Sequence, residues 1–239
     1  ERFFIAAVKA HTDVVRDETL LRAARDFCAQ EGIHGREHIR YNEMVRRQGY
    51  PIEAMEKRVE ALLARATKRT TPSGRLAATC ALEHFTALLA HFVLSDSRLL
   101  EGAHPVMAHL WRWHSAEENE HKAVAFDVYR AAKGAYVERI MAMIFATTIF
   151  WTKVFEHQVR LMHADGILFS GREWYSLFRF LFIAPGGLAR LFFPYWEYYR
   201  ADFHPWQLDN RDLLQAWKEE LASSPSYAQG TAEMTPHSA

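Results

Sequence analysis

Apolar residues recur every three or four positions along most of the 239-residue chain, and no stretch alternates apolar and polar residues over the length of a β-strand. Glycine, proline and serine interrupt this helical periodicity at intervals. The pattern therefore predicts an all-α fold. The expected helices cover residues 1–15, 17–48, 51–69, 75–94, 105–132 and 135–163, with further helices up to residue 222.

Local signals support several of these helix ends. Asp17 precedes an apolar-periodic run and is suited to be its N-cap, and the break at residues 49–51 ends that run. The next helix begins at Pro51 and carries Glu53 and Glu56 in its first turns, where acidic side chains interact favourably with the helix dipole. This third helix has the position of a crossover between two pairs of helices.

The last third of the chain is much richer in aromatic residues. Residues 174–199 contain many Trp, Tyr, Phe and Leu and are divided by a break at residues 184–187, and arginines recur at positions 172, 179, 190 and 200. This composition is typical of a segment that lies at a membrane interface, so peripheral membrane contact through residues 172–200 is one interpretation. Helices packed on the bundle, or on the partner subunit of a homodimer, would have the same composition.

Length and composition limit the membrane interpretation. Neither half of this segment, nor the apolar run at residues 140–151, reaches the ~20 residues that a membrane-spanning helix needs. From residue 223 onward the composition is typical of turns and tails, so residues 223–239 are predicted to be disordered.

The overall composition excludes some classes of protein. With 49% apolar residues the chain can bury one large core, so a single helical domain over residues 1–222 is expected. Lys and Arg together number 29, as do Asp and Glu, and the absence of a basic stretch argues against a nucleic-acid partner. Cys28 and Cys80 are too few for a disulfide framework, which fits a reducing cytoplasm, and we expect both to be buried thiols of the core.

The clearest chemical pattern lies in the helix expected at residues 105–132. His114, Glu118 and His121 follow one another at i, i+4 and i+7, so a helix places two imidazoles and a carboxylate on one stripe. Trp111 and Trp113 flank them, and burying such polar groups without compensation would cost several kcal/mol. A bound cation would supply that compensation. Glu117 and Glu120 lie about 100° and 200° around the helix from Glu118, away from the stripe.

Two further helices carry matching groups. Glu31 and His34 form a Glu-x-x-His unit in the second helix, and Glu83 is the single carboxylate between residues 75 and 94. Ferritin-like di-metal bundles bind their ions with such Glu-x-x-His units and with a lone Glu from each of two other helices. His38 and Glu37 are expected to lie outside the ligands, either beside them, where they would orient the ligating histidines, or at the surface.

The spacing of these residues repeats along the chain. Glu1 precedes Glu31 by 30 residues and Glu83 precedes Glu118 by 35, so a hairpin with a lone Glu followed by Glu-x-x-His occurs twice. Two such hairpins joined by a crossover predict a ferritin-like four-helix bundle over about residues 1–132, followed by additional C-terminal helices at about 135–222. The predicted metal ligands are Glu1, Glu31, His34, Glu83, His114, Glu118 and His121.

The donor types suggest which metal the site would take. Four carboxylates balance the charge of two divalent ions, and three neutral imidazoles complete the set. A shell of oxygen and nitrogen without thiolate suits iron or manganese better than a structural zinc site. Two iron ions are therefore the expected cofactor, with manganese or zinc as alternatives.

The motifs of residues 27–42, 81–86 and 113–129 resemble those of a bacterial family catalogued as predicted metal-dependent hydrolases. The opening Glu-Arg-Phe-Phe is similar to a segment that follows a Phe-Pro-x-Gly turn in that family. The resemblance supports Glu1 as the first ligand and implies that residues precede it in the full-length protein. It also implies hydrolysis at a metal site.

The order of the ligands is similar to that of a di-iron N-oxygenase that acts on p-aminobenzoate, and this similarity implies the same seven ligands. Little else is similar, so its substrate is not transferred. The main functional expectation is a di-iron oxidase or oxygenase that uses O₂, an apolar or lipid-like substrate and an electron donor still to be identified. A metal-dependent hydrolase with a two-metal-activated water is the alternative, and non-catalytic iron binding or ferroxidase activity is a second alternative.

Overall fold

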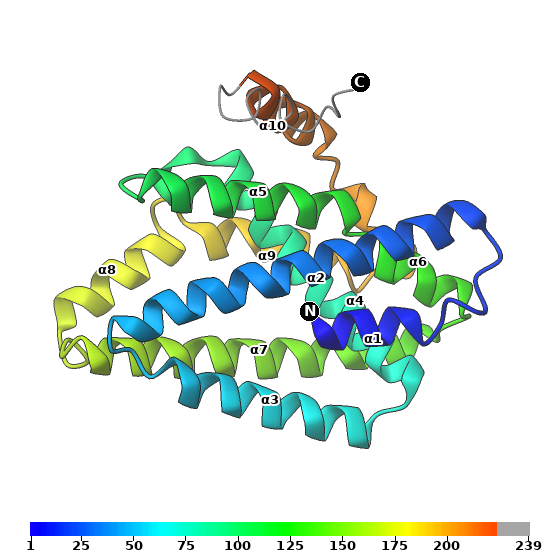
Figure 1. Ribbon diagram of the computed structural model, residues 1–239, viewed down its shortest axis with the longest axis horizontal. Coiled ribbons are helices and arrows are strands. Elements are labelled where there is room, and N and C mark those ends of the chain that lie inside the picture. The colour runs from blue at the N-terminus through cyan, green and yellow to red at the C-terminus, as the bar shows by residue number, and fades with distance from the viewer. Residues whose placement is uncertain (224–239) are drawn as a thin grey trace, which may run out of the picture.

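The structure is a computed structural model that describes residues 1–223 (Figure 1). Within this range all regular structure is helical and no strand occurs, which confirms the all-α prediction. The predicted tail lies outside the described residues, except for Ser223 at the end of the last helix. The helices are α1 (Arg2–Lys9), α2 (Glu18–Arg47), α3 (Ile52–Arg69), α4 (Pro72–Ser95), η1 (Ser97–Leu100), α5 (Pro105–His121), α6 (Val124–Ala131), α7 (Tyr136–Ala164), α8 (Gly171–Phe182), α9 (Gly187–Glu197), η2 (Pro205–Gln207) and α10 (Arg211–Ser223).

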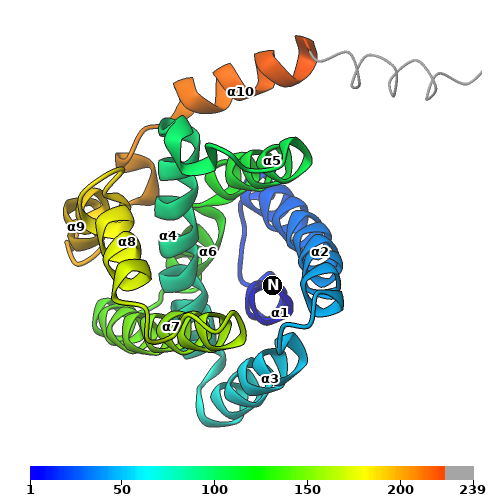
Figure 2. The ribbon, with the colours of Figure 1, turned by 90° about the vertical axis from the view of Figure 1, so that its left-hand side faces the viewer.

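Helix α4 occupies the middle of the molecule. It packs against α1, α5, α6, α7 and α9, and Figure 2 shows it between α2 and α5 on the right and α8 and α9 on the left, with α7 below it. The side chains of Leu76, Ala77 and Ala81 are fully buried. A helix that is apolar around most of its circumference needs partners on all sides, and the other helices supply them.

Helix α4 begins three residues earlier than the pattern predicted. The hydroxyl oxygen of Thr71 accepts a hydrogen bond of 2.9 Å from the backbone N–H of Gly74, and Pro72 follows at the first helical position. Both features stabilise a helix N-terminus, because Pro has no N–H to leave unpaired there. Residues 72–74 are therefore helical, although they read as loop residues in the sequence.

Helix α1 is shorter than the predicted 1–15. It ends at Lys9, and side chains that follow it contact its last carbonyl groups. The Thr12 hydroxyl donates a hydrogen bond to the carbonyl oxygen of Lys9 at 3.0 Å, and Nδ1 of His11 lies 2.9 Å from the carbonyl oxygen of Ala7. Such local side-chain bonds compete with continuation of the helix.

The single helix predicted at residues 105–132 is two helices, α5 and α6. Lys122 and Ala123 separate them but keep right-handed helical backbone angles, so the break is a bend. The buried ammonium group of Lys122 donates hydrogen bonds to the carbonyl oxygen of Leu208 at 2.6 Å and to Oδ1 of Asn210 at 2.8 Å. The bend thus lies where the C-terminal region is attached to the bundle.

Other predicted boundaries agree with the structure. Asp17 caps α2 by accepting from the N–H of Thr19 at 2.7 Å, and α7 ends within one residue of the prediction. Residues 183–186 separate α8 from α9, as expected from the break in the aromatic segment. A side chain at Gly187 would overlap the ring of Phe92, so glycine lets the start of α9 approach α4 closely.

Helix α4 is also the one described helix that is long and apolar enough by itself to cross a membrane, but 67% of its most apolar window is buried inside the bundle. Helices α8 and α9 meet the same measure only as a pair, across a bend of 44°.

Candidate metal centre

Three helices bring the predicted ligands together at the centre of the bundle. Helix α2 supplies Glu31 and His34, α4 supplies Glu83, and α5 supplies His114, Glu118 and His121. All except His114 are buried, and His114 is nearly so. Glu31, His34, Glu118 and His121 each offer one ligand atom, and these four atoms lie within 4.8 Å of one another.

His121 connects the carboxylates of two helices. Its Nε2 lies 3.4 Å from Oε1 of Glu31, and its Nδ1 lies 3.3 Å from Oε2 of Glu83. On the same stripe of α5, Nε2 of His114 lies 3.4 Å from Oε1 of Glu118. The i, i+4, i+7 spacing on α5 therefore places all three side chains toward α2 and α4, as the sequence predicts.

His34 is contacted at both ring nitrogens. Its Nδ1 lies 3.5 Å from Glu31 and 3.3 Å from Glu118, and its Nε2 forms a 2.9 Å hydrogen bond with Oε2 of Glu117. Glu117 lies off the ligand stripe, as expected, but its position on the side of α5 that faces α2 makes it the partner of a ligand. Glu120, also off the stripe, instead pairs with Lys218 at 2.8 Å.

Glu1 and His38 lie at the outer end of this cluster. Oε1 of Glu1 is 2.7 Å from Nδ1 of His38, and the rings of His38 and His34 lie 4.9 Å and 4.2 Å from that of His114. Burial opposes the shift, but the bond with His38 lowers the pKa of Glu1 below its ordinary value. Glu1 is thus near the cluster without touching its four closest members.

Glu37 does not reach the cluster. Its carboxylate pairs instead with Arg40 at 2.7 Å on the outside of α2, as a surface group would. Glu37 precedes His38 by one residue, which rotates its side chain about 100° away from that of His38.

The centre of the cluster carries polar atoms that form no hydrogen bond within the described chain. They are Oε1 of Glu31, Nδ1 of His34, both carboxylate oxygens of Glu83, Oε2 of Glu118 and both ring nitrogens of His121. A buried polar atom without a partner costs about 1–3 kcal/mol, and more when it is charged. Their convergence on one point fits a bound metal, which would take these atoms as ligands.

Burial and close contact also shift the pKa values of these groups. Burial raises the pKa of the Glu83 carboxyl far above its ordinary value. Burial lowers the pKa of His34 and His121, but their contacts with the surrounding carboxylates outweigh it and raise both. In the metal-free protein the imidazolium groups thus neutralise part of the carboxylate charge, and metal binding must displace their protons.

Aromatic side chains surround the cluster. The ring of Phe27 lies 4.9 Å from that of His121, and the ring of Trp113 lies 5.4 Å from that of His34. The inner end at Glu83 is buried, whereas the side chains of Glu1 and His38 at the outer end are 26% and 37% exposed. The cluster is therefore most deeply buried at Glu83 and least buried at Glu1 and His38.

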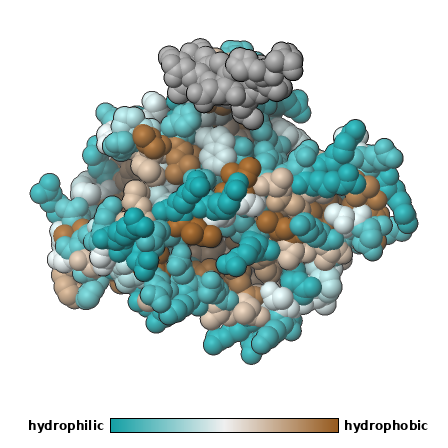
Figure 3. Space-filling model, viewed as in Figure 1, coloured by the Kyte–Doolittle hydropathy of each residue, from teal (hydrophilic) through white to brown (hydrophobic). Residues whose placement is uncertain are grey.

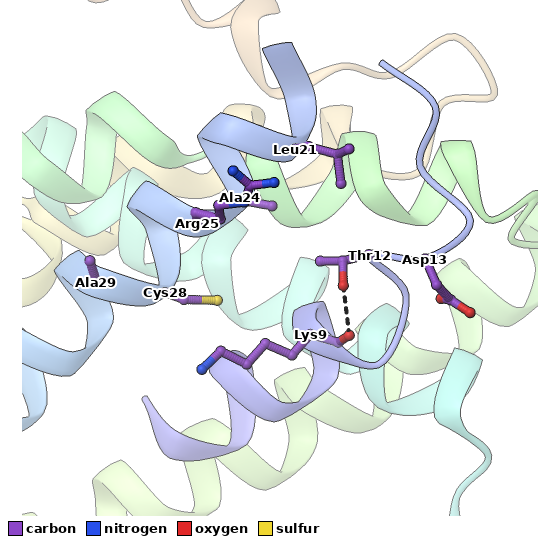
Figure 4. Close-up of a pocket in the computed structure, with 8 residues that line it drawn as sticks. All are labelled: Lys9, Thr12, Asp13, Leu21, Ala24, Arg25, Cys28 and Ala29. Carbon is purple, nitrogen blue, oxygen red and sulfur yellow. Dashed lines mark hydrogen bonds between the residues drawn. The ribbon is translucent and has the colours of Figure 1, made fainter. Parts of the chain in front are cut away.

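A separate cavity of about 670 Å³ lies between α1 and α2, and Figure 4 shows its lining residues. None of them belongs to the Glu/His cluster. Cys28, which we expected to be buried, is only half-buried and lines this cavity one turn before Glu31, whereas Cys80 is buried as predicted. The cavity has an open, mixed-charge rim with Lys9, Arg25 and Asp13, which does not distinguish a ligand class.

Comparison with known proteins gives one match. A family model described as a predicted metal-dependent hydrolase matches residues 1–209, a range that contains every predicted ligand. No curated protein and no solved structure matches the chain.

Proposed function

The chain belongs to the family of predicted metal-dependent hydrolases, and from this membership we propose that its Glu/His cluster holds divalent metal ions for hydrolysis of an ester or phosphoester. The observation that carries the proposal is the buried cluster of carboxylates and imidazoles whose inward atoms have no hydrogen-bond partner among the described residues. The family match favours this alternative over the oxygenase that we expected from the ligand order.

We assign the ions to Glu31, His34, Glu118 and His121, with Glu83 on the inner side and Glu1 and His114 on the outer side. Four carboxylates balance two divalent ions, so the donor set fits a di-metal site in a ferritin-like arrangement. Ions of this kind lower the pKa of bound water and polarise a carbonyl or phosphoryl oxygen.

The chain's own residues would prepare the reaction. Glu117 fixes the ring of His34 so that Nδ1 faces the cluster, and Phe27 and Trp113 exclude water from the ligands. His38 is bonded to Glu1 through Nδ1, while its Nε2 has no hydrogen-bond partner among the described residues. This nitrogen is buried beside the outer end of the cluster.

The test is metal-dependent turnover in the absence of O₂. Apoprotein is loaded with Zn²⁺ or Mn²⁺ under nitrogen and assayed with panels of carboxylic esters, phosphomonoesters and phosphodiesters. We expect hydrolysis that requires metal and falls at least 100-fold in Glu118→Ala, with Glu120→Ala as the matched control. If neither metal supports hydrolysis of any panel member, the hydrolase proposal fails.

A second candidate is an O₂-activating di-iron oxidase or oxygenase, as the ligand order first indicated. It is favoured by the absence of thiolate among the clustered donors, since oxygen and nitrogen ligands suit iron. Two ferrous ions would supply the electrons that reduce O₂, and the aromatic surroundings would suit an apolar substrate. This candidate requires an electron donor for repeated turnover.

Oxygen uptake separates the candidates. Anaerobic apoprotein receives two equivalents of Fe²⁺, O₂ is admitted, and oxygen consumption and near-UV absorption are followed in the wild type and Glu118→Ala. Rapid uptake lost in the variant supports the oxidase, and uptake without any organic product indicates ferroxidase or iron storage. If the ferrous protein consumes no O₂, the redox candidates fail.

A further inference from the structure

The exposed apolar side chains of this protein are concentrated on one part of it. Among the described residues, 4 large apolar side chains that are exposed lie before residue 136, and 17 lie between residues 136 and 196. Phe169 is 97% exposed and Phe193 is 77% exposed. We call these residues the aromatic face: Tyr136, Val137, Met141, Ile144, Phe145, Ile149, Val154, Phe155, Phe169, Tyr175, Phe178, Phe180, Phe182, Ile183, Phe192, Phe193 and Trp196.

The aromatic face belongs to three adjoining helices. Helices α7 and α8 meet where the rings of Phe155 and Trp174 lie 6.0 Å apart, and α7 and α9 meet where the hydroxyls of Thr147 and Tyr195 lie 2.9 Å apart. Figure 2 shows α8 and α9 to the left of α4 and α7 below them. Figure 3 shows apolar areas among hydrophilic residues on the face of the molecule seen in Figure 1.

The described helices cover α8 and α9 only in part. No residue of α8 is buried, and in α9 only Gly187 is. Helices with large aromatic side chains normally bury them against a partner, and an exposed apolar surface of this kind usually marks a binding site. The described helices do not provide that partner.

The charges of α8 and α9 indicate the kind of partner. Residues 171–200 contain four arginines but only two acidic residues, Glu173 and Glu197. Arg179 is exposed and has no ion pair within the described chain, whereas Arg190 lies 2.7 Å from Asp96. Arginines interleaved with Trp, Tyr and Phe are typical of helices that lie in the interface of an anionic membrane.

We propose that the aromatic face binds the surface of an anionic lipid membrane, with α8 and α9 lying in the interface and Arg172 and Arg179 of α8 paired with lipid phosphates. Helices α8 and α9 have 12 and 11 residues, and each alone is too short to cross the ~30 Å hydrocarbon core. A two-fold contact between copies would bring the same arginine-bearing surface against itself, whereas anionic lipid complements its charge.

Vesicle flotation tests this proposal directly and independently of catalysis. Full-length protein is mixed with vesicles of phosphatidylcholine alone or with 30% phosphatidylglycerol. We expect binding to the anionic vesicles that weakens as salt increases, and at least tenfold weaker binding to neutral ones. In vesicles with brominated acyl chains, the tryptophan fluorescence of the wild type should be quenched, since Trp196 lies on the face.

Matched variants locate the surface. Phe178→Ser/Phe193→Ser/Trp196→Ser should reduce binding at least tenfold. The control Ile39→Ser/Val106→Ser removes apolar side chains that are 63% and 67% exposed elsewhere, and it should bind like the wild type. Arg172→Gln/Arg179→Gln should lose the preference for anionic vesicles. Far-UV circular dichroism and metal content verify that each variant is folded.

Three outcomes would overturn the proposal. The first is that the wild type does not bind anionic vesicles. The second is that the serine variants on and off the aromatic face bind the vesicles equally well. The third is that vesicle binding is absent and light scattering shows a wild-type dimer that the triple substitution dissociates. The last result would assign the aromatic face to contact between copies. Hydrolase activity plays no part in any of these measurements, so failure of the function proposal would leave this test unaffected.

Discussion

The imidazole of His34 is held from both sides. Its Nδ1 faces the carboxylates of Glu31 and Glu118, and its Nε2 is bonded to Glu117. A metal ligand that is fixed in this way has its ring orientation set before the metal arrives, which increases affinity. Glu117 is therefore a positioning residue for the proposed centre.

Replacing Glu117 tests this role. Glu117→Ala should weaken metal binding about 10- to 100-fold, because the ring of His34 loses the partner that orients it. Glu117→Gln should lose less, since its side-chain oxygen can still accept from Nε2. Competitive titration with a chromophoric chelator measures the affinities, and Glu120→Ala serves as the control. Equal affinity of Glu117→Ala and the wild type would show that Glu117 has no influence on the site.

Replacing Glu83 should destabilise the metal-loaded protein much more than the metal-free protein. Burial raises the pKa of its carboxyl, so the apoprotein gains little from this group, and Glu83→Ala should leave apoprotein stability nearly unchanged. With free metal at 100 times Kd, binding stabilises the wild type by about 2.7 kcal/mol. That increment should largely vanish in the variant. Urea unfolding with and without chelator measures both states, and an unchanged increment would exclude Glu83 as a ligand.

Spacing along single helices predicts most of the cluster, because residues three, four and seven apart share a helix face. Glu31 with His34 and His114 with Glu118 and His121 follow from this rule. Glu117 does not, since only the packing of α2 beside α5 shows that its side of α5 faces a ligand. The sequence also left open whether Glu37 orients a ligand or lies at the surface, because its proximity to His38 in sequence does not imply proximity to the cluster.

At the scale of helices, contacts between distant segments decide what local patterns leave open. Asp17 and the break at residues 184–187 are local signals, and the helix ends they predict are found. The start of α4 was missed because Thr71 and Pro72 resemble a turn as much as a cap. The bend between α5 and α6 was missed because Lys122 binds groups at Leu208 and Asn210, more than 80 residues away.

Asp96 joins α4 to α9. Located at the C-terminal end of α4, it accepts hydrogen bonds from Arg98 at 2.8 Å and from Arg190 of α9 at 2.7 Å. The bond from Arg98 is the main cause that holds the pKa of Asp96 far below its usual range. A carboxyl with a lowered folded-state pKa stabilises the fold above its unfolded pKa, and this contribution is lost as the pH falls.

The expected result is pH-dependent. Asp96→Asn should lower Tm at neutral pH, and the difference from the wild type should shrink as the pH falls below about 4, the unfolded pKa of aspartate. Asp202→Asn removes a pair with Arg200 that lies on the surface and spans two residues, so it should have a much smaller effect. A difference in Tm that stays constant down to pH 2 would contradict this role of Asp96.

For the whole molecule, the periodicity predicts an all-α protein, and the structure confirms it. The resemblance to the hydrolase family is confirmed over residues 1–209. The sequence left open whether the aromatic segment packs on the bundle, because apolar composition is the same in both cases. In the structure α9 packs on α4 while Phe169 and Phe193 stay exposed, and membrane contact stays a prediction. The single-domain prediction and the ferritin-like arrangement stay predictions.

Lys122 ties the C-terminal region to the rest of the molecule. Lys122→Met should lower the free energy of unfolding by about 2 kcal/mol, since the carbonyl of Leu208 and the amide of Asn210 lose a charged donor in a buried place. Lys218→Met, which removes an exposed pair with Glu120, should cost less than about 1 kcal/mol. Urea unfolding gives both values, and similar losses in the two variants would argue against the proposed tie.

The enclosure of α4 also has a consequence for mutational tolerance. A larger side chain at Leu76, Ala77 or Ala81 cannot turn into solvent, and forcing it into a packed core costs about 1–3 kcal/mol. Helix α3, in which only Ile52 and Met55 are buried, has no such restriction. In a library of random single substitutions selected for soluble folded protein, surviving variants should therefore be scarcest in α4 and plentiful in α3, even far from any metal ligand.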